Sequence, residues 1–329
     1  MKMLERMFAL PLSLMAALMF ASSAPALAAY PDQPIRMVVG FSPGGGVDVV
    51  GRIMAQALAE QLNTTVVVEN KSGFSGNIAA QQVKQSAPDG YTLLMAPTTS
   101  YALVQTMLGS QQVGYDLVKD FKSAGTVGIL PLVVIVNRSL GVNTLQELIA
   151  AANSKTKKLA YGSSGNGSTE HIITELFLQD AKMEMLHVPY RGSSPAMADL
   201  LSGEIQLFMA TTPTALANLA SGRLTAIGIA SPQRLPVLAD VPTLDEQGLK
   251  GFEAASTYSI LLPAGTPSAV LERLNAALAK ALQSNALQEK LMKLGVKVQA
   301  GTLEESAHQL ANEAAKWPRA IKALNLKSN

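Results

Sequence analysis

Three short clusters of glycine and hydroxyl residues each follow an apolar run in this chain. The clusters lie at 41–46, 97–100 and 163–168. Each offers backbone amides and Ser or Thr hydroxyls near the start of a helix, and these groups donate hydrogen bonds to an anion. Because ligands of open parallel sheets bind at the carboxyl ends of strands, we expect the three clusters to converge on one small anion.

The histidines do not form a metal or catalytic motif. Only His171, His187 and His308 occur, with no His-Glu-x-x-His pattern and no ligand pair at helical spacing. The sequence therefore predicts no metal and no catalytic residues. The nucleophile-elbow pattern Gly-x-Ser-x-Gly is also missing, and we expect no His or acid beside a candidate nucleophile. A binding protein is favoured over a hydrolase that would use the same crevice.

The loop at 41–46 resembles a dinucleotide-binding loop, because it joins a strand to a helix and Glu69 ends the next strand. The fingerprint would need glycine at position 49, where the chain has Val49. Asp48 already places a carboxylate at the helix N-terminus, where a pyrophosphate would bind. We therefore expect no cofactor, and Asp48 is interpreted as a helix cap.

The apolar pattern predicts an α/β protein. A buried strand over 35–39, a helix from Val49 onward and a strand over 65–69 form a βαβ unit, whose strands should be parallel. Similar alternation continues to the end of the chain. Further strands are expected at 92–96, 124–127, 132–136, 159–162, 186–188, 205–209, 224–230, 258–262 and 296–298.

The N-terminal segment has the pattern of a secretory signal. Lys2 and Arg6 precede an apolar run over 7–20, which is shorter than the ~20 residues of a membrane-spanning helix. Small residues at Ala26 and Ala28 predict cleavage after Ala28 and a periplasmic protein. The chain has no Cys, so its stability must come from a core rather than from disulfides. Its length favours two domains.

The charge is close to balanced, with a formal net charge of +2. No basic stripe with interleaved aromatic residues occurs, so we do not expect nucleic acid as a partner.

A series of motifs resembles the Bordetella uptake gene (Bug) family, the substrate-binding subunits of tripartite tricarboxylate transporters. The resemblance covers nearly the whole chain after residue 28. The motifs occur in the family's order at 41–48, 68–73, 76–78, 87–94, 120–121, 165–168, 187–192, 240–243, 263–267 and Trp317.

This resemblance implies a periplasmic binding protein fold of type II, the Venus flytrap. After a signal peptide over 1–28, residues 29–130 and 256–329 would form one α/β lobe and residues 131–255 the other. Crossing strands near Pro131 and Tyr258 would join the two lobes. The resemblance further implies a monomer that binds a small carboxylate and delivers it to integral-membrane transporter subunits, and a sensing subunit with the same pocket is the alternative.

The resemblance also implies which residues bind the carboxylate. In the first lobe they are Ser42, Gly45, Gly46 and a wall made by Thr98, Thr99 and Ser100. In the second lobe they are Ser164, Gly167 and Ser168, with Tyr190 and Thr211 on the far side. Two departures from the family pattern stand out. Ala210 occupies a position where relatives often have Asp, which argues against an amino-acid ligand, and Phe74 interrupts a glycine-rich segment.

Overall fold

The first strand, helix and strand form the predicted βαβ unit. Strand β1 (Ile35–Val39) leads into helix α2 (Gly46–Leu62) and returns through β2 (Val66–Asn70). β1 and β2 are parallel, with Ile35 paired to Val66. The computed structural model describes residues 30–154 and 158–324, and the predicted signal segment lies outside these residues. From Gln33 onward the chain forms one compact unit.

The sheet is mixed and runs through this unit in the strand order β2-β1-β3-β9-β4-β7-β5-β6, while β8 and β10 each pair with β4. Strands β1, β2 and β3 are parallel, as are β5, β6 and β7, whereas β4 and β9 run antiparallel to their neighbours. The remaining strands are β3 (Thr92–Pro97), β4 (Phe121–Asn137), β5 (Ala160–Ser163), β6 (Leu186–Pro189), β7 (Leu207–Thr211), β8 (Leu224–Ile229), β9 (Ala255–Pro263) and β10 (Lys297–Val298).

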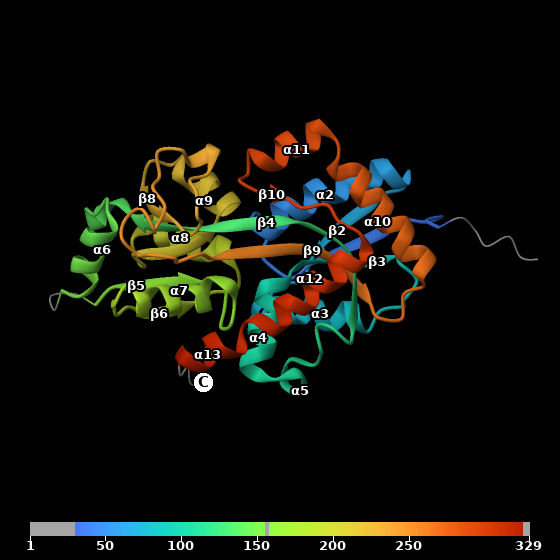
Figure 1. Ribbon diagram of the computed structural model, residues 1–329, viewed down its shortest axis with the longest axis horizontal. Coiled ribbons are helices and arrows are strands. Elements are labelled where there is room, and N and C mark those ends of the chain that lie inside the picture. The colour runs from blue at the N-terminus through green and yellow to red at the C-terminus, as the bar shows by residue number, and fades with distance from the viewer. Residues whose placement is uncertain (1–29, 155–157, 325–329) are drawn as a thin grey trace, which may run out of the picture. The chain divides into compact units, whose positions relative to one another are not determined.

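Helices flank the sheet along its length (Figure 1). They are α3 (Asn77–Lys84), α4 (Thr98–Leu108), α5 (Ser110–Val113), α6 (Leu145–Ala152), α7 (Thr169–Asp180), α8 (Ser193–Ser202), α9 (Thr212–Leu219), α10 (Ser268–Leu282), α11 (Asn285–Met292), α12 (Leu303–Lys316) and α13 (Pro318–Leu324). Single 3-10 turns occur at η1 (Phe74–Gly76), η2 (Arg138–Leu140) and η3 (Pro236–Leu238). No helix in the described part of the chain is both long and apolar enough to cross a membrane.

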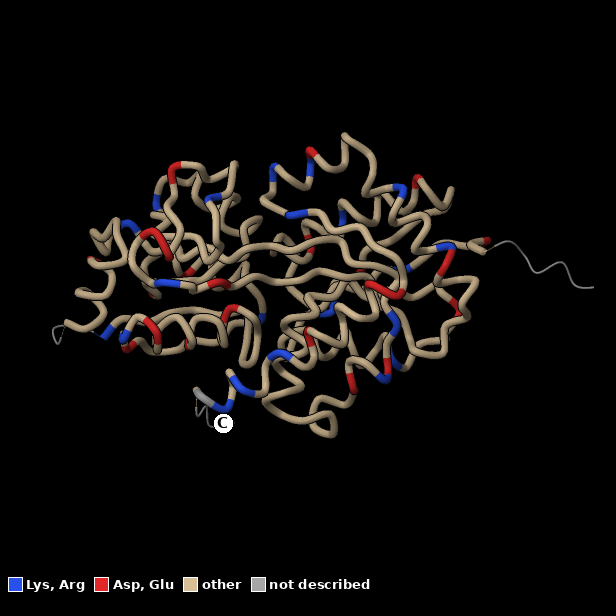
Figure 2. The backbone as a smooth tube through the Cα atoms, viewed as in Figure 1, with Lys and Arg blue, Asp and Glu red and all other residues tan. Residues whose placement is uncertain are grey.

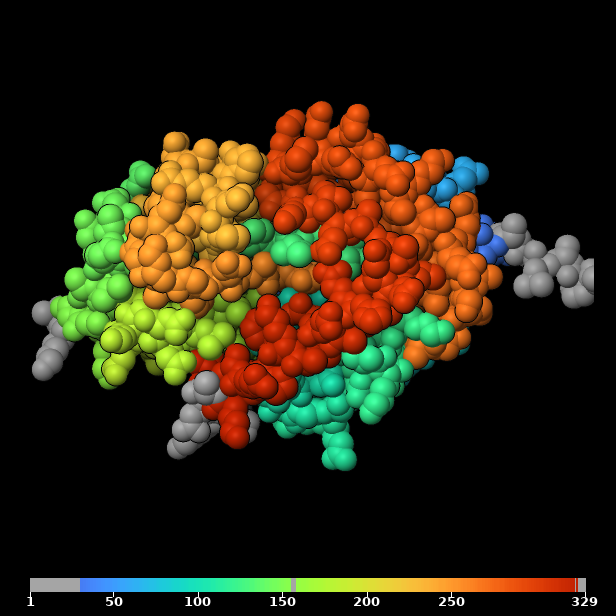
Figure 3. All heavy atoms as spheres, in the orientation of Figure 1, coloured from blue at the N-terminus to red at the C-terminus, as the bar shows by residue number. Residues whose placement is uncertain are grey.

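The long strand β4 connects the two parts of the sheet. Up to Pro131 it pairs with β9, and from Leu132 onward it pairs with β7 and β8. Part of it is visible as a green patch between the yellow-orange and red surfaces (Figure 3). The sequence predicted two separate strands here, and that prediction was wrong. Pro131 does not end the strand because proline accepts extended backbone, and it lies where the strand changes partners.

Alternation along β4 builds a core on each side of the sheet. Leu132, Val134 and Val136 belong to one buried cluster with Phe177, whereas Val133 and Ile135 face a second cluster that contains Phe208. Successive side chains of a strand point to opposite faces. Because both faces are covered, the strand reads as a continuous apolar run in the sequence.

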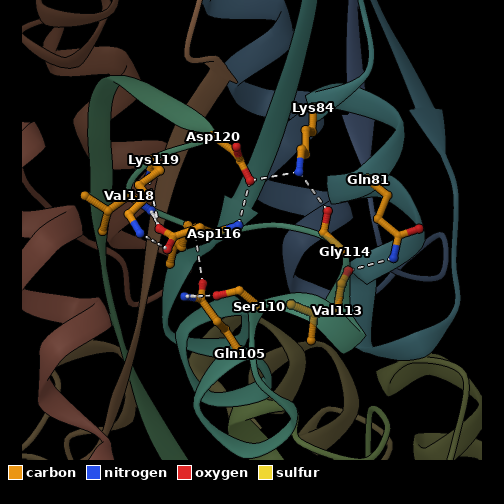
Figure 4. A network of polar contacts seen from close by, with 11 residues as sticks. Gln81, Lys84, Gln105, Ser110, Val113, Gly114, Asp116, Val118, Lys119 and Asp120 are labelled. Atoms are coloured by element: carbon orange, nitrogen blue, oxygen red, sulfur yellow. Dashed lines mark hydrogen bonds and ion pairs between the residues drawn. The ribbon is translucent and has the colours of Figure 1, made fainter.

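Asp120, one of the motif residues, anchors the loop that leads into β4. Its Oδ2 accepts a hydrogen bond from the backbone amide of Asp116 at 2.7 Å and lies 2.9 Å from Lys84 Nζ. The same ammonium donates to the carbonyl of Gly114 at 3.0 Å (Figure 4). Asp120 therefore fixes the connection between α3, α5 and β4, and this motif has a structural role.

Two helices begin with a complete capping box. Thr144 and Glu147 form a complete capping box at α6, and Thr302 and Glu305 form another at α12. Along the described backbone, Lys and Arg are interspersed with Asp and Glu (Figure 2).

Candidate functional site

Four helices direct their N-terminal ends at one small cavity in the middle of the sheet edge. The cavity is lined by the first residues of α2 (Gly46, Val47), α4 (Ser100), α7 (Thr169, Glu170) and α8 (Ser193), together with Phe41, Gly45, Pro97, Ser256 and Tyr258. The N-terminus of a helix carries a partial positive charge and unpaired amides. Four such ends around one cavity favour a negatively charged occupant.

The cavity has two walls, one from each part of the sheet. The first wall is formed by α2 and α4, which follow β1 and β3. The second wall is formed by α7 and α8, which follow β5 and β6. These are the carboxyl ends of parallel strands on either side of the point where strand order changes, which is the expected place for a ligand crevice.

Direct hydrogen bonds join the two walls around the cavity. The amide of Gly46 donates to Thr214 Oγ1 at 3.1 Å, and Ser75 Oγ donates to the carbonyl of Asn166 at 2.7 Å. Ser194 Oγ donates to the carbonyl of Pro43 at 2.8 Å. The volume of the cavity is about 10 Å³, which is room for about one water molecule. A small organic ligand would not fit in this volume with the walls in the present position.

Two cavity hydroxyls have no hydrogen-bond partner in the protein. Ser100 Oγ and Thr169 Oγ1 are both buried and both lack a partner within the described residues. Buried polar groups are almost always paired, so an unpaired hydroxyl on a cavity wall is a donor available to a ligand. Sequence reasoning named Ser100 and missed Thr169, although Thr169 directly follows the third predicted cluster.

The other predicted hydroxyls of the first wall are already bonded within the protein. Thr98 Oγ1 donates to the carbonyl of Thr257 at 3.2 Å, and Thr99 Oγ1 accepts from the amide of Thr257 at 3.1 Å. Thr98, Thr99 and Ser100 form the first turn of α4 rather than a loop. Ser42 lies at the seam of the walls, where its Oγ donates to Ser194 Oγ at 3.3 Å.

In the second wall the predicted residues shape the loop between β5 and α7. Ser168 caps α7 through the amide of His171, and the amide of Gly167 donates to His171 Nδ1 at 3.0 Å. Ser164 Oγ donates to Glu170 Oε2 at 2.6 Å. Gly167 has a φ of +78°, a backbone conformation that glycine adopts most easily.

Tyr190 and Thr211 are not among the residues that line the cavity. Tyr190 OH donates to Asp199 Oδ2 at 2.6 Å on α8. Thr211 lies beside Gly46, where a Cβ added to the glycine would approach Thr211 Oγ1 to 2.5 Å. Thr211 therefore limits how closely α2 approaches the second wall. Phe74 is 45% exposed, and neither it nor Arg191 lines the cavity.

Asp48 stabilises the start of α2 from within its first turn, although the N-cap residue is Gly45 and not Asp48 as the sequence predicted. Its Oδ2 accepts from the amide of Gly44 at 2.9 Å and from Arg52 Nε at 3.0 Å, while Asn70 Nδ2 donates to Oδ1 at 2.8 Å. Burial acts to raise the pKa of this carboxyl, and the hydrogen bonds from Arg52, Gly44 and Asn70 outweigh it and lower the pKa.

One expectation about catalytic residues was wrong, because a histidine does lie beside a serine. Ser163 Oγ and His187 Nε2 share a hydrogen bond of 2.7 Å. Ser163 is fully buried, does not line the cavity, and also contacts the backbone of Gly165 at 3.2 Å. His187 is stacked on His171 with ring centroids 3.9 Å apart. The Ser163 and His187 pair therefore supports the loop between β5 and α7 and does not line the cavity.

Glu170 is another cavity residue that sequence reasoning did not identify. This residue is 7% exposed, lines the cavity and is the second residue of α7. Burial raises its pKa, partly offset by hydrogen bonds from Ser164 and Ser168. In the sequence it reads as an ordinary acidic residue in the first turn of a helix.

A mixed α/β sheet flanked by helices, with a small cavity at the strand ends, is the architecture that this chain shares with solved periplasmic binding proteins. The chain belongs to the tripartite tricarboxylate transporter receptor family, whose model matches residues 50–326. The similar protein BugD is a periplasmic binding protein, and membership of this family implies a periplasmic location.

Solved structures agree with this assignment. The periplasmic binding protein BugD is 31% identical, with a TM-score of 0.85 over 91% of this chain and 99% of that one. A protein of R. palustris solved with adipate is 32% identical, with a TM-score of 0.85 over 90% and 98% of the two chains. MatC from Rhodopseudomonas palustris, with bound malate, is 28% identical, with a TM-score of 0.83 over 89% and 100%.

Proposed function

We propose that this chain captures a small carboxylate in the periplasm and delivers it to the integral-membrane subunits of a tripartite tricarboxylate-type transporter. The observation that carries the proposal is the convergence of the N-termini of α2, α4, α7 and α8 on one cavity. Structurally similar family members were solved with adipate and malate, both of which are dicarboxylates.

The proposed binding groups are the donors on the cavity walls. They are the Ser100 and Thr169 hydroxyls and the backbone around Gly45 and Gly46. The residues Ser164, Gly167 and Ser168 shape the loop that carries Thr169. Burying a carboxylate is costly unless each oxygen finds a donor, and helix ends supply donors without a cationic side chain.

We further propose that residues 29–130 and 256–329 move as one lobe and residues 131–255 as the other, with hinges where β4 changes partners and near the start of β9. The pairing of β4 supports this division, since its register partners change after Pro131. A ligand larger than the 10 Å³ cavity requires such an opening.

Binding rather than catalysis is proposed because no described cavity residue combines a hydroxyl nucleophile with a histidine base. The Ser163 and His187 pair lies outside the cavity lining. Export through a signal peptide cleaved after Ala28 is also part of the proposal. Amino-terminal sequencing of the protein from a periplasmic fraction should therefore begin at Ala29.

A thermal-shift screen tests the proposed ligand class. The panel contains citrate, short dicarboxylates, benzoates, amino acids, sugars and divalent metals. A true ligand at about 100 times its Kd should stabilise the protein by about 2.7 kcal/mol. Stabilisation by a sugar or a metal, with no response to any carboxylate, would contradict the proposal.

A further inference from the structure

The turn at 73–76 has an unusual backbone conformation. Its residues Gly73, Phe74, Ser75 and Gly76 all have positive φ, at +137°, +48°, +51° and +87°. Phe74 and Ser75 are not glycine, and non-glycine residues rarely adopt this conformation because their Cβ crowds the backbone. Such a conformation persists only where the surrounding structure enforces it, and it often marks a segment with a function.

Contacts on the side of the first wall enforce this conformation. The buried Asn77 donates from Nδ2 to the carbonyl of Phe74 and accepts through Oδ1 from the hydroxyl of Tyr115. Gly76 packs against Tyr101, since a Cβ on this glycine would lie 2.9 Å from Tyr101 Cε1. All of these residues precede β4 in the chain. The shape of the turn therefore does not depend on the second wall.

The Ser75 side chain connects this turn to the second wall. Its Oγ donates to the carbonyl of Asn166 at 2.7 Å, in the loop between β5 and α7. The approach is close, because a Cβ on Gly165 would lie 2.7 Å from the same Oγ. The other hydrogen bonds between the walls described above join the loop over 41–46 to α8 and α9. Ser75 therefore contacts the part of the second wall that leads to Thr169.

The hydrogen bond from Ser75 to Asn166 favours the closed form. When the walls separate, water replaces the Asn166 carbonyl as the partner of the hydroxyl, so the bond contributes to the closed form alone. A contact that is made in one of two states shifts the equilibrium toward that state. Because the turn has its shape before the walls meet, closure has few further bonds of the turn to order. The bond must break before the walls separate, so it acts on the rate of opening.

We infer that residues 73–76 form a latch, in which the Ser75 hydroxyl holds the loop between β5 and α7 in the closed form and slows opening. The inference rests on the proposed function, because it takes the movement of two lobes from it. It adds that a single hydroxyl, which does not line the cavity, controls how long a bound carboxylate stays.

Single-molecule fluorescence energy transfer on the ligand-free protein tests the latch. The chain has no Cys, so Gln112→Cys in the first proposed lobe and Glu184→Cys in the second supply the only two labelling sites. Both residues are exposed. The dwell times of the open and closed forms are measured in the labelled wild type, in Ser75→Ala and in Ser75→Gly.

Ser86→Ala is the matched control for the loss of a hydroxyl. Ser86 Oγ donates to the carbonyl of Val83 at 2.7 Å, which is a bond of the same kind and length within the first proposed lobe. This variant therefore removes an equivalent hydrogen bond that does not join the walls.

Ser75→Ala should shorten the dwell time of the closed form about five-fold and leave that of the open form unchanged. Ser75→Gly should have the same effect, because it also lacks the hydroxyl, and Ser86→Ala should have none. An unchanged closed dwell time in Ser75→Ala would overturn the inference. A wild-type dwell time in Ser75→Gly would also overturn it, because the effect would then come from backbone strain. A labelled wild type with one form only would overturn the proposed movement of the lobes, and the latch with it.

Discussion

At the scale of single residues, the hydroxyls that line the cavity differ in their hydrogen bonding from the hydroxyls that support the cavity walls. Ser100 and Thr169 have no partner in the described protein, whereas Ser164 donates to Glu170. Removing an unpaired buried hydroxyl breaks no protein hydrogen bond, while removing a paired one leaves its acceptor unsatisfied. The two groups of residues should therefore respond differently to substitution.

Ser100→Ala and Thr169→Val should change the free energy of unfolding without ligand by less than about 1 kcal/mol, and should weaken ligand binding about ten-fold. Ser164→Ala should lower the free energy of unfolding by about 1–3 kcal/mol, because Glu170 loses its donor. Urea unfolding and calorimetry measure the two effects. A large loss of stability in Ser100→Ala, with unchanged affinity, would show that its hydroxyl is structural.

Sequence reasoning found hydroxyls at the strand ends but not the acid beside them. Ser100 was predicted because hydroxyls after a strand are a recognisable pattern, whereas Glu170 looks like an acid that favours a helix N-terminus. Its position on the cavity wall depends on how far α7 is buried, which no local pattern encodes.

At the scale of elements, β6 and α7 contribute a stacked histidine pair beneath the cavity loop. Burial and the charge of His187 lower the pKa of His171 to about 3, and burial lowers the pKa of His187 to about 4. In the unfolded chain both titrate near 6.5. The unfolded state therefore binds more protons between these values, and stability should fall as the pH falls from about 6.5 toward 4.

His187→Gln should reduce this loss of stability, because one of the two buried rings no longer titrates. The melting temperature between pH 7 and pH 4.5 measures the effect, and His308→Gln on the exposed face of α12 serves as the control. If the melting temperature of His187→Gln fell with pH as steeply as that of the wild type, the buried histidine pair would not be the source of the pH dependence.

Most elements were predictable because their signals are local. The strand over 35–39 and the parallel βαβ unit that it opens occur where the sequence placed them. The continuous strand β4 was not predicted, since Gly128 and Pro131 are typical breakers. Pairing of Gly128 with Tyr258 and of Pro131 with Ala255 keeps the segment extended, and these contacts are distant in sequence.

At the scale of the whole molecule, closure of the two walls depends on the close approach of α2 to the second wall. A Cβ on Gly46 would lie 2.5 Å from Thr211 Oγ1 and 3.0 Å from Thr214 Oγ1. Both threonines belong to the opposite wall. Gly46 is the first residue of α2, where alanine is locally acceptable.

Gly46→Ala should therefore prevent full closure while each lobe stays folded. Ligand affinity should fall about ten-fold or more, with less than about 1 kcal/mol lost from the unfolding free energy without ligand. Small-angle X-ray scattering should show that ligand contracts the wild type but not the variant. A normal contraction in Gly46→Ala would mean that closure does not bring Gly46 against Thr211.

Native mass spectrometry of protein purified from the periplasm shows whether the cavity binds a small carboxylate. We expect one bound small carboxylate per chain, lost on unfolding and present at lower occupancy in Gly46→Ala purified in the same way. A bound sugar or metal ion in place of a carboxylate would contradict it.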